Sequence, residues 1–221
     1  MMNKLIVGNW KMNGNLSLVD EFSQTLDARV ILGIPSVFIA YAHLKNPTMQ
    51  LAAQDCSVYA DFGAHTGEIS AEMLSQVGCK YVIIGHSERR QTSNFDNQQN
   101  VFAKLQNVVK AGMTAIICID ESYPALVDNQ TKEFLKTNLD KVCIAYEPLS
   151  AIGTGKVPSL KDISETLSKI KNTYFGMKTL YGGSVNVSNA KEILSVELVD
   201  GVLIGGASLK LSELNEIARL S

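Results

Sequence analysis

The sequence has almost no net charge and no long run of basic residues. Its 221 residues include 20 lysines and arginines and 22 aspartates and glutamates, which gives a formal charge of -2, and no basic run is longer than Arg89-Arg90. Surfaces that bind nucleic acid or anionic membranes concentrate positive charge. We therefore expect no nucleic-acid or membrane partner, and a small molecule as the ligand.

The sequence also lacks the features of secreted and membrane-spanning proteins. Its four cysteines, Cys56, Cys79, Cys118 and Cys143, show no Cys-x-x-Cys spacing. No apolar run approaches the roughly 20 residues that cross a bilayer. A strand-like segment begins at Lys4 with no secretory signal before it. These absences predict a cytoplasmic protein with reduced, structural thiols.

Patterns that hold metals or nucleotide cofactors are missing as well. The three histidines lack ligand spacing, and no Gly-x-Gly-x-x-Gly segment joins a strand to a helix. We expect neither a metal nor a cofactor.

The sequence alternates short apolar runs with segments in which apolar residues recur every three or four positions, as in a helix. Leu16, Val19 and Phe22 are an example. Strand followed by helix, repeated, predicts parallel strands. Eight such units favour a closed (β/α)8 barrel over an open doubly wound sheet, with residues 1–221 as one domain. Such barrels typically have ~250 residues, so we expect a compact one with shortened helices. The expected strands are 5–8, 30–34, 50–54, 80–85, 114–119, 141–146, 178–181 and 201–205.

Polar residues stand where several of these strands end, and parallel barrels collect their reactive groups at that end. The first strand ends at Asn9 and Lys11, the fourth at His86, and the sixth at Glu147, which precedes Pro148. A carboxylate that can be closed off from water is a strong base. These strand ends therefore supply a base, hydrogen-bond donors and a fixed cation.

Glycines follow the sixth, seventh and eighth strands. The relevant segments contain Gly153, Gly182-Gly183-Ser184 and Gly205-Gly206. Main-chain N–H groups free of side-chain bulk can surround a phosphate oxygen, and the loops after strands seven and eight commonly do so, often with a short helix that would begin here at Ala207-Ser208.

Each of these features also has an ordinary structural explanation. His86 alone could be a satisfied core histidine, Lys11 beside Trp10 could lie over an aromatic ring, and Glu147 could form a cap or a salt bridge. The glycine pairs could simply turn the chain. Their coincidence at the strand ends favours a functional site.

The motifs that carry these residues resemble, in order and over almost the whole chain, those of the triosephosphate isomerase family. The resemblance implies a TIM barrel that interconverts dihydroxyacetone phosphate and D-glyceraldehyde 3-phosphate in glycolysis and gluconeogenesis. The matching segments are Asn9-Trp10-Lys11, residues 63–68, Gly85-His86-Ser87-Glu88-Arg89-Arg90, Ala145-Tyr146-Glu147-Pro148, residues 151–156, Tyr181-Gly182-Gly183-Ser184 and residues 205–208.

The resemblance also implies a role for each matching residue. Glu147 would move the proton between two carbons, His86 and Asn9 would donate to the enediolate oxygens, and Lys11 would add positive charge. Glu88 would organise Lys11, Ser87 would hold the base while its loop is open, and Ile152 would keep water from the base. The positions that match the phosphate-binding ones are Gly153, Ser184, Gly205 and Gly206.

The chain departs from the common family pattern at three places near the predicted site. Ser150 stands where most members have a hinge tryptophan, and Asp120 stands where a glycine usually follows strand five. Pro158 has no N–H, whereas that position often donates to the tyrosine that matches Tyr181. We expect altered loop kinetics with the chemistry intact.

The resemblance alone predicts a homodimer. Thr66 and His65 lie in the segment that matches the loop the family inserts into a partner subunit. His65 replaces an aromatic residue often found there, which would weaken the contact or make it pH-sensitive.

Two other functions would fit parts of the sequence. Another phosphosugar-binding barrel isomerase or lyase would share the glycine pairs but would not need Asn9, Lys11, His86 and Glu147 together. A catalytically inactive barrel that acts as a binding protein is favoured only by the altered hinge at Ser150.

Overall fold

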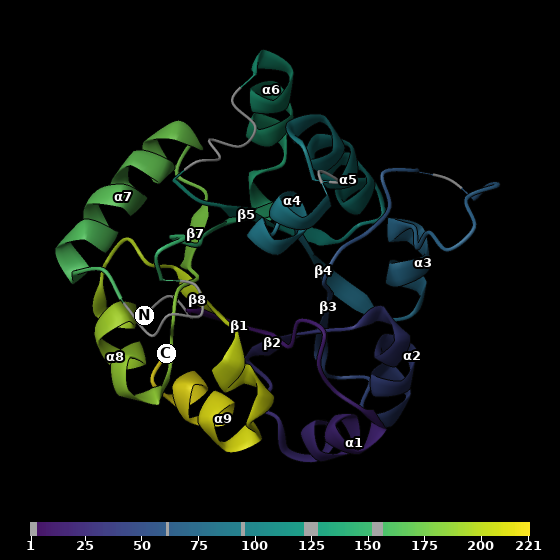
Figure 1. Ribbon diagram of the computed structural model, residues 1–221, viewed down its shortest axis with the longest axis horizontal. Helices are drawn as coiled ribbons and strands as arrows, with labels where there is room; N and C mark the ends of the chain where they lie inside the picture. Colours follow the sequence, from purple (N-terminus) through teal and green to yellow (C-terminus); the bar gives the residue numbers. More distant parts are fainter. Residues whose placement is uncertain (1–3, 61, 94–95, 122–127, 152–156) are drawn as a thin grey trace.

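Eight parallel strands form a closed barrel in which β1 pairs with both β2 and β8. The computed structural model describes residues 4–60, 62–93, 96–121, 128–151 and 157–221. The ring of strands lies at the centre, and the helices surround it (Figure 1). The predicted fold class, a (β/α)8 TIM barrel, is therefore confirmed.

Each predicted strand is present, with ends within one residue of those expected from the apolar runs. The strands are β1 (Leu5–Asn9), β2 (Val30–Ile34), β3 (Gln50–Ala53), β4 (Cys79–Ile84), β5 (Thr114–Ile119), β6 (Val142–Tyr146), β7 (Lys178–Tyr181) and β8 (Gly201–Ile204).

Six of the helices begin where a short polar side chain caps their free N–H groups. Asn15, Asn97 and Ser159, for example, each accept a hydrogen bond from a backbone N–H in the first turn of the helix that follows. The helices are α1 (Leu16–Thr25), α2 (Ser36–Lys45), α3 (Ala71–Gln76), α4 (Ser87–Ser93), α5 (Gln98–Lys110), α6 (Asn129–Thr137), α7 (Leu160–Thr173), α8 (Val187–Ser195) and α9 (Leu211–Arg219), with 3-10 turns η1 (Leu139–Lys141) and η2 (Gly206–Leu209).

The expected shortening of the helices is clearest after β3 and β4. There α3 has 6 residues and α4 has 7, whereas α7 has 14. Among the described residues, none of the helices is long and apolar enough to cross a bilayer.

The core has two layers because successive side chains of a strand point to opposite faces. The outer layer lies between the strands and the helices and includes Ile6, Val82 and Ile144. The inner layer fills the barrel with Val7, Ile31, Ala52, Ile83, Ile116, Cys118, Cys143, Ala145, Leu180 and Leu203. The next inward position on a strand therefore opens at the mouth of the barrel.

All four cysteines are buried and free, as the sequence predicts. Burial raises the pKa of Cys56 and of Cys79 to about 12 and that of Cys143 to about 11. These thiols stay protonated at neutral pH, which fits a structural role.

Closure of the barrel depends on the small size of Gly201, where β8 meets β1. A Cβ added at Gly201 would lie 2.2 Å from the carbonyl oxygen of Leu5, whereas one added at Gly206 would meet no described atom within 4 Å. We expect Gly201→Ala to lower the free energy of unfolding by at least about 3 kcal/mol, at the upper end of overpacking costs. Urea denaturation of both variants tests this, and equal midpoints for Gly201→Ala and Gly206→Ala would contradict it.

Candidate active site

The alternation along the strands carries two of the predicted site residues into the mouth of the barrel. Val7 points inward, so Asn9, two residues later on β1, is also on the inner side, and the order Cys143, Ala145, Glu147 does the same after β6. Asn9 is 5% exposed and Glu147 is 6% exposed. Both polar side chains are thus held in a largely water-free environment.

His86 leaves β4 by a different route, because Gly85 has a φ of +68° and breaks the strand geometry. The Nδ1 atom of His86 accepts a hydrogen bond from the backbone N–H of Glu88 at 3.2 Å. An accepting nitrogen carries no proton, so the ring is neutral with its proton on Nε2. This Nε2 atom faces Glu147, with 3.3 Å between it and Oε1.

Contacts to both its backbone and its carboxylate hold Glu147 in place. Its backbone N–H donates to the carbonyl of Ile119 at 2.8 Å, and the Cys118 thiol donates to its carboxylate. Burial, followed by the charge of Glu147, raises the pKa of Cys118 well above its ordinary value, so the thiol remains a donor. Gly182 provides the room, since a Cβ there would lie 2.6 Å from Cγ of Glu147.

Two buried atoms of this pair have no hydrogen-bond partner among the described residues. They are Nε2 of His86, a donor, and Oε2 of Glu147, an acceptor. Buried polar atoms without partners cost free energy, so they are rare outside sites that bind something. The arrangement has the capacity to donate to one oxygen of a bound molecule and to accept a proton from a neighbouring atom.

Lys11 supplies the positive charge near this pair. It adopts a φ of +55°, an uncommon conformation for a lysine, and its backbone N–H donates to Oδ1 of Asn9 at 3.0 Å. Its Nζ atom lies 2.5 Å from Oε1 of Glu88. The structure therefore brings Glu88 to Lys11, the contact that the family resemblance predicts.

A cavity of about 450 Å³ adjoins Glu147 on the side of β7 and β8. The residues Asn9, Lys11, Ser184, Gly205 and Gly206 line it, so predicted catalytic and phosphate-binding positions share one space. The turn η2 begins at Gly206, where the sequence predicts a short helix.

Hydrogen bonds hold the start of the loop after β6. Glu121 accepts from the hydroxyl of Tyr146 and from the backbone N–H of Leu149, both at 3.1 Å, and Ser184 donates to the carbonyl of Ala151 at 2.6 Å. The buried hydroxyl of Tyr181 has no partner among the described residues. The predicted residues Ile152 and Gly153 lie outside the described residues.

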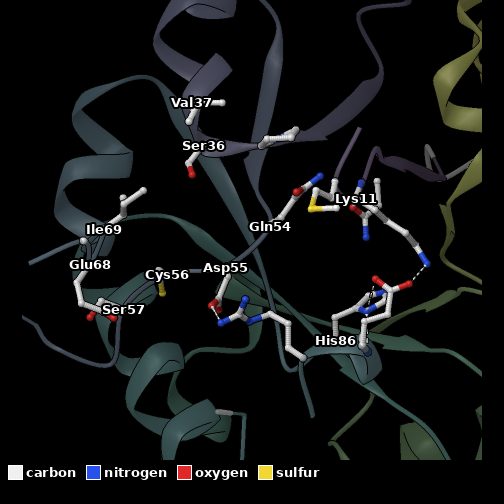
Figure 2. Close-up of a pocket in the computed structure, with 16 residues that line it drawn as sticks. Lys11, Ser36, Val37, Gln54, Asp55, Cys56, Ser57, Glu68, Ile69 and His86 are labelled. Atoms are coloured by element: carbon white, nitrogen blue, oxygen red, sulfur yellow. Dashed lines mark hydrogen bonds and ion pairs between the residues drawn. The ribbon is translucent and has the colours of Figure 1, made fainter. Parts of the chain in front are cut away.

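A second cavity, of about 460 Å³, opens beside the first (Figure 2). Lys11 and His86 lie at one side of it, and Glu68 and Ile69 lie at the other. Met12 and Val37 also line it and are highly exposed, at 96% and 78%. This cavity therefore joins Lys11 and His86 to exposed apolar side chains.

The predicted interface residues lie on an exposed segment next to this second cavity. His65 and Thr66 are exposed, and the His65 ring stacks on Tyr59 with centroids 3.5 Å apart and planes 4° apart.

Ser87, another predicted site residue, is buried at the start of α4.

The sequence analysis missed three residues that support the site. Cys118 contacts Glu147, Gly182 makes room for its side chain, and Asp96 accepts from the N–H of Gly85 at 3.2 Å. For the first two the signal was available, because they continue the inward alternation of β5 and β7. Asp96 follows Gly85 by 11 residues in an irregular segment, so no periodic pattern could indicate it.

Comparison with known proteins gives one consistent result. Residues 4–221 match the family described as triosephosphate isomerase. A triosephosphate isomerase of Francisella tularensis subsp. holarctica is 41% identical over 248 aligned positions, with 98% of this chain and 96% of the relative covered, and one of Albidiferax ferrireducens is 38% identical with 96% of each covered. The crystal structure of triosephosphate isomerase from Bartonella henselae superposes with a TM-score of 0.82 at 32% identity and covers 99% of this chain and 98% of that one.

The unpartnered hydroxyl of Tyr181 leads to a stability prediction. Burial raises the pKa of Tyr181 to about 12, so the hydroxyl is neutral and its loss removes an unsatisfied buried group. We expect Tyr181→Phe to leave the free energy of unfolding unchanged or to raise it by up to about 1 kcal/mol. Tyr146→Phe, the matched control, removes a hydroxyl that donates to Glu121, and we expect it to cost about 1 kcal/mol. Urea denaturation decides between them, and a larger loss for Tyr181→Phe would contradict the prediction.

Proposed function

The chain belongs to the triosephosphate isomerase family, and we propose that Glu147, His86, Asn9 and Lys11 carry out its reaction, the interconversion of dihydroxyacetone phosphate and D-glyceraldehyde 3-phosphate. The observation that carries the assignment is the buried pair of Glu147 and neutral His86, which face each other across 3.3 Å and retain one unpartnered atom each.

The chemistry follows from what each group can do. The carboxylate of Glu147 takes a proton from the carbon beside the substrate carbonyl, and the C–H electron pair becomes the double bond of an enediolate. His86 donates through Nε2–H to an enediolate oxygen, and the positive charge of Lys11 lowers the energy of the intermediate. Return of that proton to the neighbouring carbon, with transfer of the hydroxyl proton from one enediolate oxygen to the other, gives the other triose phosphate, so no redox partner is needed.

Asn9 contributes through its position. Its Oδ1 atom accepts from the N–H of Lys11 at 3.0 Å, so its side-chain amide group has a defined orientation at the mouth of the barrel. The amide N–H is then available to a substrate oxygen. Glu88 keeps Lys11 in place through their contact at 2.5 Å.

The phosphate of the substrate would lie against Ser184, Gly205 and Gly206, with Gly153 closing over it. These loops leave main-chain N–H groups accessible, and the lining of the 450 Å³ cavity supports this assignment. Binding a group that does not react supplies free energy for closing the loop over the part that does. In the closed state Ile152 would keep water from Glu147, and in the open state Ser87 would hold the carboxylate.

Glu147→Ala tests the reaction and its base together. We expect fast conversion of glyceraldehyde 3-phosphate to dihydroxyacetone phosphate by the wild type, and a loss in kcat of about 10³-fold in the variant, within the range of general acid–base catalysis. The assay couples the product to oxidation of NADH by a dehydrogenase. Glu133→Ala, which removes an exposed carboxylate on α6 that pairs with Lys136, serves as the matched control and should keep wild-type activity.

The outcomes separate the proposed function from its alternatives. Equal and negligible rates in wild type and Glu147→Ala would leave an inactive or different phosphate-binding barrel. Equal and fast rates would show contamination by host isomerase or a base other than Glu147.

We propose that the protein is a homodimer in which the segment around His65 and Thr66 of one subunit enters the second cavity of the other. The exposed apolar lining at Met12 and Val37 and the exposed position of the segment support this arrangement. Because that cavity reaches Lys11 and His86, the partner segment would also shield the active site. We propose the cytoplasm as the location of the protein, because glycolytic reactions take place there.

Two aspartate substitutions on α2 test the dimer. Val37 lines the second cavity, whereas Leu44 is equally exposed, at 80%, and does not line it. We expect Val37→Asp to be a monomer and Leu44→Asp to remain a dimer in sedimentation velocity at micromolar concentration, because only the first places a charge in the buried interface. A monomeric wild type, or two dimeric variants, would contradict the proposal.

A further inference from the structure

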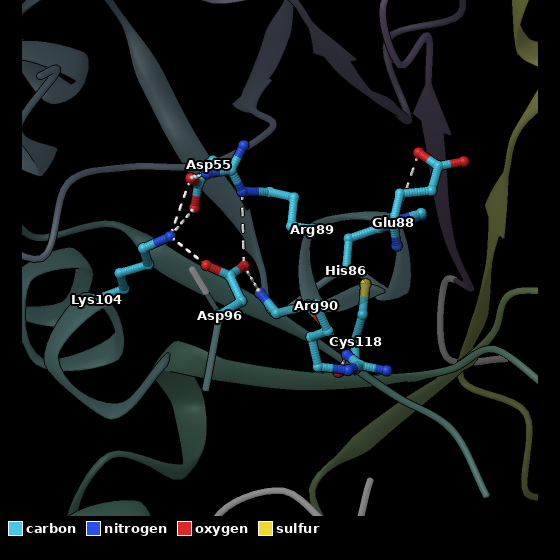
Figure 3. Close-up of polar contacts among 9 residues, drawn as sticks. Asp55, His86, Glu88, Arg89, Arg90, Asp96, Lys104 and Cys118 are labelled. Carbon is cyan, nitrogen blue, oxygen red and sulfur yellow. Dashed lines mark hydrogen bonds and ion pairs between the residues drawn. The ribbon is translucent and has the colours of Figure 1, made fainter. Parts of the chain in front are cut away.

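The peptide groups on both sides of Gly85, the residue before His86, are held by charged side chains. The N–H of Gly85 donates to Oδ2 of Asp96 at 3.2 Å, and its carbonyl accepts from Nη1 of Arg90. Asp96 is itself buried and lies 2.5 Å from Nζ of Lys104 (Figure 3). Since Gly85 has a φ of +68°, these contacts stabilise the uncommon backbone that sets the direction of His86.

Arg90 extends this support to the neighbouring strand. Its Nη1 atom donates to the carbonyl of Cys118 at 3.1 Å, and Cys118 carries the thiol that contacts Glu147. Its Nη2 atom forms an ion pair with Oδ2 of Asp120. One guanidinium group therefore joins the end of β4, which carries the histidine, to the end of β5, which lies under the base.

Asp120 continues the inward order of Ile116 and Cys118 on β5 and stands at a position where the family usually has glycine. Its side chain is 2% exposed and that of Arg90 is 11% exposed. A guanidinium group this deeply buried requires a nearby carboxylate to offset its lost hydration. Asp120 provides that carboxylate, and its rigid attachment to the strand fixes where the guanidinium lies.

Given the role proposed above for His86, we propose that Asp120 is a positioning residue of this enzyme. It anchors Arg90, Arg90 holds the carbonyl of Gly85, and the fixed Gly85 peptide aims Nε2 of His86 at the substrate. The effect of Asp120 on the reaction passes entirely through the placement of the histidine.

Kinetics of Asp120→Ala give the first test. We expect kcat to fall about 10- to 100-fold, the range for a small misplacement of a reacting group, with KM near the wild-type value. Asp120→Asn keeps an oxygen that accepts from Arg90 and should recover part of the loss. Asp200→Ala is the matched control: Asp200 pairs with Lys171 and accepts from the N–H of Thr179 at 2.7 Å near the start of β7, at the other end of the barrel, so kcat should be unchanged.

The histidine ring itself gives the second test, since the chain has only three histidines. Long-range proton–nitrogen NMR spectra should show the wild-type His86 ring with its proton on Nε2. We expect Asp120→Ala to shift the His86 ring signals while those of His43 and His65 stay in place, Asp120→Asn to shift them less, and Asp200→Ala to leave them unchanged.

The outcomes of these two tests support or overturn the proposal as follows. Wild-type kcat in Asp120→Ala, or a reduced kcat with unshifted His86 signals, would overturn the proposal, the second because Asp120 would then act only on general stability. If Asp120→Ala fails to fold, the same two measurements on Asp120→Asn decide the question. If Glu147→Ala and wild type are equally inactive, the proposed function fails, while the ring signals still show whether Asp120 positions His86.

Discussion

The site depends on one constraint, the two-residue alternation of side chains in a barrel that closes on itself. Because β1 pairs with β8, no strand can shift its register without breaking closure, so the inward positions are fixed all round the ring. The inner layer of apolar side chains ends at the mouth, where Asn9 and Glu147 take the next inward positions. His86 is the exception, and it needs Gly85 in a left-handed conformation to reach the same space. Glu147 and His86 thus follow β6 and β4, the strands on either side of β5.

Around His86 and Glu147, buried charged side chains have partners of opposite charge. His86 and Glu147 themselves each keep one atom with no hydrogen-bond partner among the described residues. Nζ of Lys104 lies 2.8 Å from Asp55 and 2.5 Å from Asp96, and Asp96 holds the peptide before His86 (Figure 3). Buried ion pairs are poor sources of net stability because desolvation offsets their attraction, yet removing one partner is costly. They therefore fix geometry more than they add stability. The unpartnered Nε2 of His86 and Oε2 of Glu147 lie inside this rigid shell, where a substrate would satisfy them.

The sequence predicts the strands and strand-end residues well, for a physical reason. Buried parallel strands are short apolar runs, and in a closed barrel the residue at the end of each run has little freedom in where it points. Asn9, Glu147 and Lys11 follow from that rule. Asp96 does not, because it lies in the turn before α5 and is separated from Gly85 by α4, so no strand periodicity relates the two residues. The single domain, the dimer and the cytoplasmic location stay predictions, and the last two are not expressed in the contacts of one chain.

The loop after β6 differs from the common family pattern at Ser150 and Pro158, and these differences affect which hydrogen bonds the loop can form. Its start is tied to β5 through Glu121, which accepts from both Tyr146 and the main chain of Leu149, although Ser150 replaces the hinge tryptophan. Its far end has Pro158, which has no N–H to offer, and the hydroxyl of Tyr181 is left without a partner in the described part of the chain. In the proposed mechanism, closing this loop over Glu147 would gain no hydrogen bond from Pro158 to Tyr181. The phosphate of the substrate would then supply more of the free energy for closure, which would couple shielding of Glu147 more tightly to the presence of substrate.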